Sequence, residues 1–313
     1  MQKKTFLALS AVWLALAGSA FAQAPAIADP NMVYIPVAVT GQKNAYVPGF
    51  TKDNFKLLED GIAQTVTSFS AEEQPIDIDI ILAMSALQRG RADLNSSKIR
   101  EALENFRQQG NPKNKYSIEE MPFGANGIFA SIDQHITKLA TQSTNPRRVL
   151  LVLTDGFEAS GGDPARTLQE YAKKLPVPIY IIFAAGASAA PANIGELGRG
   201  QAIHLSGGAG YEDLARFTGG RLYQAEADTQ LRASLEQLAQ EFKNQYVLGF
   251  KSTNDAKDDK WRKIEIKIVN PPNGLKEKDV KTKTTRDRYF VARGSEGVAR
   301  WFSLLSGAWR GFG

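Results

Sequence analysis

The sequence predicts an α/β protein in which a doubly wound, mostly parallel sheet is inserted into a small β-rich domain formed by the two ends of the chain. Three observations predict this fold. Apolar residues alternate near both ends of the chain, which is typical of strands with one buried face. Three near-continuous apolar runs lie in the middle, and such runs suit strands that are covered on both faces. Helical apolar stripes lie between and after these runs, and this alternation favours a parallel sheet with helices on both sides.

The first 22 residues resemble an export signal. Two lysines precede an apolar run from 6 to 17, and AFA at 20–22 has the small-x-small form of a cleavage site. The apolar run is shorter than the roughly 20 residues that a membrane-spanning helix needs. We therefore expect cleavage near Ala22 and export to the periplasm or the extracellular space. A retained membrane anchor is the alternative interpretation.

The strands expected at the two ends read as the parts of one small sheet or sandwich, because isolated three-stranded pieces would leave an apolar face uncovered. A turn at Asp60-Gly61 is expected to join two of them. The alternating or apolar segments are Val33 to Val39, FKLLEDG (55–61), QTVTSF (64–69), Tyr246 to Phe250, Ile264 to Ile268, Val280 with Thr282, and YFVA (289–292).

The middle of the chain supplies the inserted α/β domain. Its expected strands are DIDIIL (77–82), RVLLVLTD (148–155) and VPIYIIFAA (177–185). Four helices are expected. The first begins at Ser96 or Ser97 and stops at Gly110, and the second runs from Ile128 to Leu139. The third opens at Asp163-Pro164 and carries Leu168, Tyr171 and Leu175, and the fourth opens at Asp228 or Thr229. Boundaries near Gln74-Pro75 and Asn244 divide the chain into a signal peptide (1–22), a β-rich domain (31–74 plus 245–293), an α/β domain (75–244) and a tail (294–313).

Composition sets limits on the chemistry. Hydrophobic residues at 43% and charged residues at 23% are ordinary globular values and exclude a disordered chain. The absence of cysteine excludes disulfides, lipid attachment to cysteine and thiolate metal sites. The formal net charge is +5, and the segment from Gln245 onward holds fifteen basic and eight acidic side chains. Because these charges alternate with apolar residues, we interpret them as a solvated sheet face rather than a nucleic-acid or lipid patch.

The tail GVARWFSLLSGAWRGFG holds two tryptophans and two arginines near the end of the chain. Residues 295–313 have the composition of an amphipathic helix that contacts a membrane surface. The same residues could dock on the protein itself, and their glycines weaken any helix. Both interpretations stay open at this stage.

Motifs for catalysis are lacking. The sequence has no cysteine nucleophile, no G-x-S-x-G elbow, no HExxH pair and no phosphate-binding GxxxxGK. The two histidines, His135 and His204, lie on unrelated segments and are expected to face solvent or to satisfy local hydrogen bonds. The Gly-rich segment 197–214 is either a recognition loop or a plain connector to the next helix.

The carboxyl ends of the expected parallel strands carry AMSAL (83–87) and TDG (154–156), and GANGIFASI (124–132) opens a helix between them. These pieces are similar to the von Willebrand factor type A domain. The wider layout resembles bacterial proteins with a VWFA-related domain in VTGQKNAYVPGFTKDNFKLLEDGIAQTVTSF, TGGRLYQ, NQYVLGF and KWRKIEI, over about Asn31 to Arg293. The resemblance implies a vWA/Rossmann-like fold and an adhesion-type, protein-binding function.

The resemblance also implies a metal-ion-dependent adhesion site, which this sequence departs from. The family uses D-x-S-x-S after the first strand, a Thr from a second loop and an Asp from a third. Mg²⁺ demands a near-octahedral shell of oxygens and gives up water reluctantly, so we expect no tight metal binding and no cofactor. Glu158 or Asp163 could still supply an oxygen. The degenerate positions are Ala83, Ser85, Leu87, Asn126 (or Ala125 in a register one residue off) and Asp155.

Two functional hypotheses follow. The leading one is an exported, non-enzymatic protein-binding module that uses the mouth of the central sheet, and the alternative is a structural envelope protein attached through its β-rich domain and tail. A hydrolase centred on Asp155 lacks a partner acid or nucleophile. Packing under the loops, or a turn role for Asp155, is the simpler interpretation of the same side chains. The partner-binding candidates are Met84, Ser85, Leu87, Phe123, Phe129 and Asp155.

Overall fold

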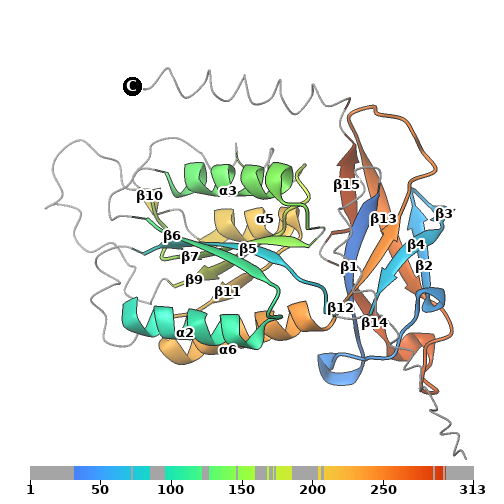
Figure 1. Cartoon of the computed structure of the whole chain (residues 1–313), viewed down its shortest axis with the longest axis horizontal. Helices are drawn as coiled ribbons and strands as arrows, with labels where there is room; N and C mark the ends of the chain where they lie inside the picture. Colours follow the sequence, from blue (N-terminus) through green and yellow to red (C-terminus); the bar gives the residue numbers. More distant parts are fainter. Residues whose placement is uncertain are drawn as a thin grey trace, which may run out of the picture.

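The computed structural model shows an α/β unit beside a β-rich unit (Figure 1). It describes residues 32–71, 73–84, 96–121, 127–145, 147–158, 168, 172, 174–184, 204–205, 208–284, 286–291 and 293. The expected export signal and the tail 295–313 lie outside these residues, and so do the aromatic and arginine side chains of the tail.

Five parallel strands form the central sheet, in the spatial order β11-β9-β7-β5-β6. Numbered along the chain, this is the order 2-1-3-4-5, one of the two common doubly wound arrangements. The predicted fold class is therefore confirmed. The strands are β5 (Asp77–Ala83), β6 (Lys115–Glu120), β7 (Arg148–Thr154), β9 (Ile179–Phe183) and β11 (Leu222–Gln224).

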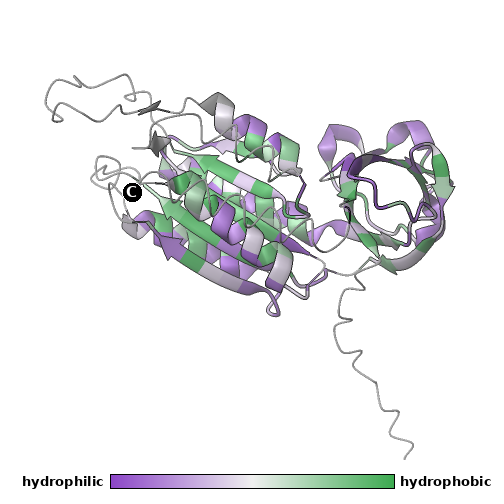
Figure 2. Ribbon diagram, turned by 90° about the horizontal axis from the view of Figure 1, so that it is seen from above, coloured by the Kyte–Doolittle hydropathy of each residue, from purple (hydrophilic) through white to green (hydrophobic). Residues whose placement is uncertain are grey.

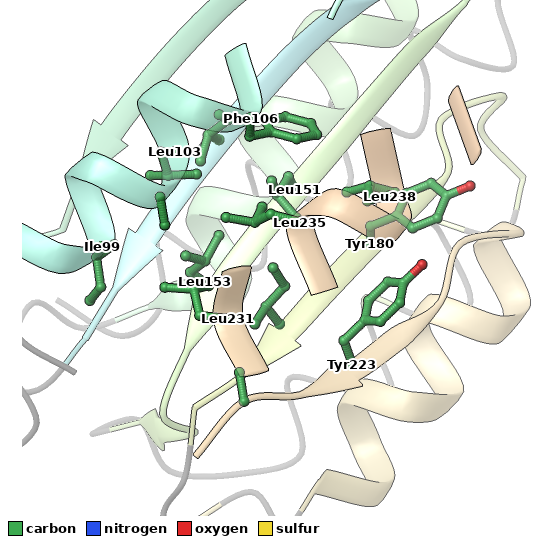
Figure 3. Packing of buried hydrophobic residues seen from close by; sticks show 14 of the residues in the cluster. Ile99, Leu103, Phe106, Leu151, Leu153, Tyr180, Tyr223, Leu231, Leu235 and Leu238 are labelled. Carbon is green, nitrogen blue, oxygen red and sulfur yellow. The ribbon is translucent and has the colours of Figure 1, made fainter. Parts of the chain in front are cut away.

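Helices cover both faces of this sheet, α2 and α6 on one side and α3 and α5 on the other (Figure 1). Side chains alternate along β5, so Ile78 and Ile80 pack toward α2 and α6 while Ile81 packs toward α3 and α5. Figure 3 shows Leu103 of α2 and Leu235 of α6 in this packing. Burying each such side chain contributes about 1.5–3 kcal/mol. The helices are α2 (Ser96–Gln109), α3 (Ile128–Gln142), α5 (Gly208–Thr218) and α6 (Asp228–Lys243).

Three of the expected helices match α2, α3 and α6 in place and in their buried stripes. In the helix expected after Asp163-Pro164, Leu168 and Ala172 are helical and buried, whereas Tyr171 lies outside the described residues. The Gly-rich segment 197–214 is in part a helix, because α5 begins at Gly208 and buries Tyr211 and Leu214. A short antiparallel pair of β8 (Phe157–Glu158) and β10 (His204–Leu205) completes the unit.

The two ends of the chain form two antiparallel four-stranded sheets, in the orders β14-β1-β12-β4 and β15-β13-β2-β3. Figure 2 shows these strands curving around a common interior, which holds a third apolar cluster. N-terminal strands pair with C-terminal strands in both sheets, as predicted. The strands are β1 (Val33–Thr40), β2 (Phe55–Glu59), β3 (Ile62–Gln64), β4 (Val66–Ser70), β12 (Gln245–Phe250), β13 (Lys260–Ile268), β14 (Lys281–Thr284) and β15 (Arg288–Val291), joined in part by short 3₁₀ turns at Gln42–Asn44, Lys52–Asn54 and Glu277–Asp279.

The segment QTVTSF differs from the expectation of a single strand. The hairpin turn lies at Asp60 and Gly61, both with positive φ as a two-residue turn requires. After the turn, however, β3 ends at Gln64 and β4 begins at Val66 in the other sheet. Gln64 marks the change, because its amide exchanges two hydrogen bonds with Thr253, Nε2 to Oγ1 at 2.9 Å and backbone N to Oε1 at 3.1 Å.

A buried guanidinium fixes the place where the chain passes between the two units. Arg147 is 3% exposed and donates to the carbonyl oxygens of Gln74 (2.5 Å) and Phe242 (2.7 Å) and to Oε1 of Gln245 (2.9 Å). Gln74 lies just before β5, and Gln245 is the first residue of β12. The domain boundaries expected near Gln74-Pro75 and Asn244 stay a prediction.

No helix among the described residues is both long and apolar enough to cross a membrane.

We predict that Arg147→Met destabilises the protein by about 2–5 kcal/mol, because it leaves three buried acceptors without a donor. Arg147→Lys should have an intermediate effect, since a single ammonium cannot span three acceptors on two chain segments. The measurement is the free energy of unfolding in urea. Arg100→Met is the matched control, because Arg100 forms an exposed pair with Glu120 and such pairs contribute about 0–1 kcal/mol. An unchanged free energy of unfolding for Arg147→Met would contradict the assigned role.

Candidate functional site

The topological switch point of the central sheet lies between β5 and β7. Ala83 at the end of β5 is directly opposite Thr154 at the end of β7. The connections leave these strands toward opposite faces, because α2, which follows β5, lies on one side, whereas Leu168 and Ala172, which follow β7, pack in the cluster on the other. Ligands of open α/β sheets bind at such points, beyond the carboxyl ends of the strands. The structure therefore brings together two of the three sequence segments that the resemblance singled out.

The end of β5 offers apolar groups to this edge. Ala83 is half-buried and presents only a methyl group. Met84 is 6% exposed and belongs to the apolar cluster beneath α2 and α6. Phe129, in the first turn of α3, is 3% exposed and stacks on Tyr211 with the ring centroids 5.4 Å apart. Met84 and Phe129 thus pack inside the protein in this structure. A direct contact of either side chain with a partner stays a prediction.

The end of β7 forms a tight turn. Thr154 is fully buried, and its Oγ1 accepts a hydrogen bond of 3.0 Å from the backbone N–H of Gly156. Gly156 has a φ of 79°, which glycine adopts without strain. Asp155 lies between them and is 6% exposed. Asp155 therefore lies in a turn at the carboxyl edge, which agrees with the simpler of the two interpretations that the sequence left open.

The remaining predicted site residues, Ser85, Leu87, Phe123 and Asn126, lie outside the described residues, as does Asp163. Glu158 is in β8, where its backbone pairs with that of His204. The described part of this edge thus consists of Ala83, Met84, Thr154, Asp155 and the strand that follows.

These residues do not fit a magnesium site. The side chain of Ala83 has no ligand atom, and the hydroxyl of Thr154 already uses one of its two lone pairs to accept the Gly156 N–H. Asp155 is left as the carboxylate of the described switch point, whereas Mg²⁺ needs a near-octahedral set of oxygens. Among the residues that the structure describes, no group of three or more His, Asp or Glu side chains could hold a metal ion.

A second polar cluster lies between α3 and the strands β5 and β6. The ring of His135 is clamped between two carboxylates, with Nδ1 2.7 Å from Asp79 Oδ2 and Nε2 2.6 Å from Glu119 Oε2. Lys138 Nζ donates to the same Asp79 oxygen at 3.1 Å. Ser131 Oγ donates to Glu119 Oε2 at 3.1 Å. We refer to Asp79, Glu119, Ser131, His135 and Lys138 as the His135 cluster.

The charges of this cluster follow from its geometry. Both ring nitrogens face carboxylate oxygens, which only accept hydrogen bonds, so the doubly protonated imidazolium is the form that satisfies both contacts. The hydrogen bond to Asp79 raises the pKa of His135 above its usual 6.5, against the opposing effect of burial and with help from Glu119. Burial of Asp79 works to raise its pKa, but the hydrogen bonds from His135 and Lys138 outweigh burial and lower it.

The cluster is not built for nucleophilic catalysis. A serine nucleophile needs a neutral imidazole within hydrogen-bond reach to take its proton. Ser131 instead donates to Glu119, and both nitrogens of His135 are engaged by carboxylates. The arrangement balances the charge of Asp79, which is 5% exposed in a central strand where an unpaired carboxylate would be costly.

The sequence interpretation missed this cluster. It expected His135 to face solvent or to satisfy a local hydrogen bond, and the actual partner Asp79 is 56 residues away. The available signal is an acidic residue inside the apolar run DIDIIL together with His135 and Lys138 on one side of a helical stripe. That combination indicates a buried charge seeking partners from the covering helix.

Strand order, parallel pairing and two helical layers show that the α/β unit is a doubly wound parallel sheet. Among solved structures, the chain is similar to VWA2, an ArnB paralog from Sulfolobus acidocaldarius (12% identity, 86% of this chain and 78% of that chain, TM-score 0.41), and to a von Willebrand factor type A protein from Catenulispora acidiphila (7% identity, 86% and 76%, TM-score 0.40).

It is also similar to an aerotolerance-related membrane protein from Bacteroides fragilis NCTC 9343, solved with multiple mutations to serines (15% identity, 53% of this chain and 98% of that chain, TM-score 0.34). A scan of family models and a search of curated proteins gave no match. With identities and TM-scores this low, we draw nothing about function from these proteins.

We predict that the His135 cluster makes stability depend on pH. Because the folded pKa of His135 is raised, its contribution is fully present below about pH 6.5 and is lost as pH rises through the folded pKa. Because the folded pKa of Asp79 is lowered, its contribution is present above about pH 4 and is lost as pH falls further. The measurement is the free energy of unfolding between about pH 2 and pH 9, with NMR titration of the imidazole.

The protein has two histidines, so the control is simple. His135→Gln should remove the loss of stability above neutral pH, and His204→Gln should leave it in place. An imidazole pKa for His135 below 6.5 would contradict the assigned charge state.

Proposed function

We propose that this chain is an exported, non-enzymatic protein-binding module that recognises its partner with the carboxyl edge of the central sheet, without a tightly bound metal ion. The observation that carries the proposal is the chemistry of the switch point. The ends of β5 and β7 lie side by side where this fold class binds ligands, yet the described residues there present a methyl group, an occupied hydroxyl and one carboxylate.

The surroundings of that edge support recognition by shape and polar contacts. The first turn of α2 and the end of β6 lie there together, because Arg100 pairs with Glu120 at 2.9 Å. Both members of this pair are exposed, and so is Ser97 in the first turn of α2. Rims of protein–protein interfaces are polar and solvent-accessible in this way. The buried Met84 and Phe129 then act as packing that holds the edge rigid.

The absence of catalysis is part of the proposal. The imidazolium of His135 is engaged by carboxylates on both sides, so it is not available as a general base. The described neighbours of Asp155 at the switch point, which are Ala83, Met84, Thr154 and Gly156, include no second acid. Export rests on residues 1–22, and the mature protein that we propose begins at Gln23.

The metal-independent part of the proposal is tested by calorimetric titration of the mature protein with Mg²⁺, Mn²⁺ and Ca²⁺. We expect no saturable heat at micromolar concentrations. The double variant Ala83→Asp, Leu87→Ser restores the D-x-S-x-S pattern and should gain measurable Mg²⁺ binding, since it adds a carboxylate and a hydroxyl. Saturable binding by the wild-type protein that is lost in Asp155→Asn would overturn this part.

The partner-binding part is tested by capture on immobilised mature protein from an extract of the producing cell's envelope. Ser97→Arg places a long charged side chain at the carboxyl edge and should lower recovery of the captured protein. Gln109→Arg is the matched control, because Gln109 is equally exposed but ends α2 at the opposite edge of the sheet. Equal recovery with both variants would place recognition elsewhere.

A further inference from the structure

A cleft of about 720 Å³ lies between the α/β unit and the β-rich unit. On one side it is lined by Ile76, Arg148 and Pro178, which stand at or just before the beginnings of β5, β7 and β9. It therefore opens at the amino edge of the central sheet, opposite the edge used in the proposed function. Its volume is in the range of small-molecule sites, which is about 300–1,000 Å³.

Both units contribute apolar walls to this cleft. Pro36 of β1 and Phe290 of β15 come from the β-rich unit, whereas Pro176 and Val149 come from the α/β unit. Phe242, at the end of α6, lies where the chain passes between the units. A ligand with a hydrocarbon body would be desolvated against these side chains.

Two arginines at the wall of the cleft have neutral partners. Arg148 donates from Nη1 to the carbonyls of Leu139 (3.2 Å), Ala140 (3.2 Å) and Ser143 (3.3 Å) at the end of α3, and its buried Nε has no hydrogen-bond partner. Arg286 donates from Nε to the carbonyl of Thr218 at 2.8 Å and from Nη2 to that of Ala172 at 3.5 Å.

The positive charge of these arginines is not neutralised. Neither forms an ion pair within the part of the chain that the structure describes, and Asp77 acts on Arg148 only from a distance. Burial, followed by the charge of Arg148, lowers the pKa of Arg286 to about 10. Carbonyl groups accept hydrogen bonds but carry no net charge, so they do not cancel the charge of the guanidiniums. Two positive charges therefore remain on one wall of the cleft.

Side chains at the opening of the cleft add to its positive electrostatic field. Lys251 and Lys257, on the loop after β12, are exposed and line the opening. Asp255 is the one carboxylate among the described lining residues. A cleft with low-dielectric walls and an excess of one charge concentrates its field on an incoming ion of opposite sign.

We infer that this cleft binds an amphipathic anion, with its acidic group at Arg148 and Arg286 and its hydrocarbon body along the apolar walls. Arginine is suited to this because its planar guanidinium can form two parallel hydrogen bonds to a carboxylate or a phosphate. Arg148 and Arg286 both line the cleft and are partly exposed. Fatty acids and acidic lipids share this chemistry, and we commit to a free, monomeric acid because the site is a cleft between two units.

The test uses dodecanoate as the probe and the whole mature protein, with binding measured by calorimetry below the micelle concentration. We expect saturable binding that weakens with added salt. Arg148→Gln, Arg286→Gln should weaken it at least about tenfold, since hydrogen bonds to charged groups are worth more than that factor. Lys251→Gln, Lys257→Gln should weaken it less and leaves the wall intact. Arg100→Gln, Arg216→Gln is the matched control at two exposed arginines.

Each outcome decides the inference. Dodecyltrimethylammonium has the same chain and the opposite charge, so equal binding of this cation would reduce the site to an apolar surface and overturn it. Retention of dodecanoate binding in both cleft variants would also overturn it. Sedimentation with phosphatidylglycerol vesicles but no binding of free dodecanoate would assign the charge to a membrane surface instead. The metal and partner-capture experiments test a different edge and are independent of this result.

Discussion

The structure depends on one buried guanidinium. Arg147 lies just before the central strand β7 and donates to the backbone of Gln74 before the α/β unit, to the backbone of Phe242 in α6, and to the side chain of Gln245 at the start of β12. Desolvation lowers the pKa of Arg147 to about 10, against the attraction of Glu73, so its placement has an electrostatic cost. Three directional hydrogen bonds offset that cost and fix both passages of the chain. The geometry of the cleft beside it follows from this arrangement.

Buried charges are balanced differently inside the α/β unit and at its junction with the β-rich unit. Inside the α/β unit, Asp79 is matched by His135 and Lys138, so a charge in a central strand is balanced locally. At the junction, by contrast, arginines are satisfied by carbonyls and stay unneutralised. The first pattern is what a stable interior requires, whereas the second leaves an electrostatic demand that an external group can meet. The distinction separates charges that are balanced locally from charges that have only neutral partners.

Much of the fold could be predicted because its signals are local. The stripes of α2, α3 and α6 and the apolar run of β7 follow from residues a few positions apart. The edge strand β6 escaped prediction because KYSIEE is polar and mostly exposed, and α5 because its first turn is rich in glycine. Asp155 was placed at the correct strand end. The inward orientation of Met84 and the pairing of Asp79 with His135 depend on which face of the sheet each side chain points to. The identity of a single residue does not determine this face.

Because entry to and exit from the α/β unit lie within the reach of one side chain, the ends of this unit are adjacent. A short peptide could therefore bridge the two passages without separating β4 and β12, which pair directly. β1 and β12 also pair directly, so the outer strands stay joined across this junction.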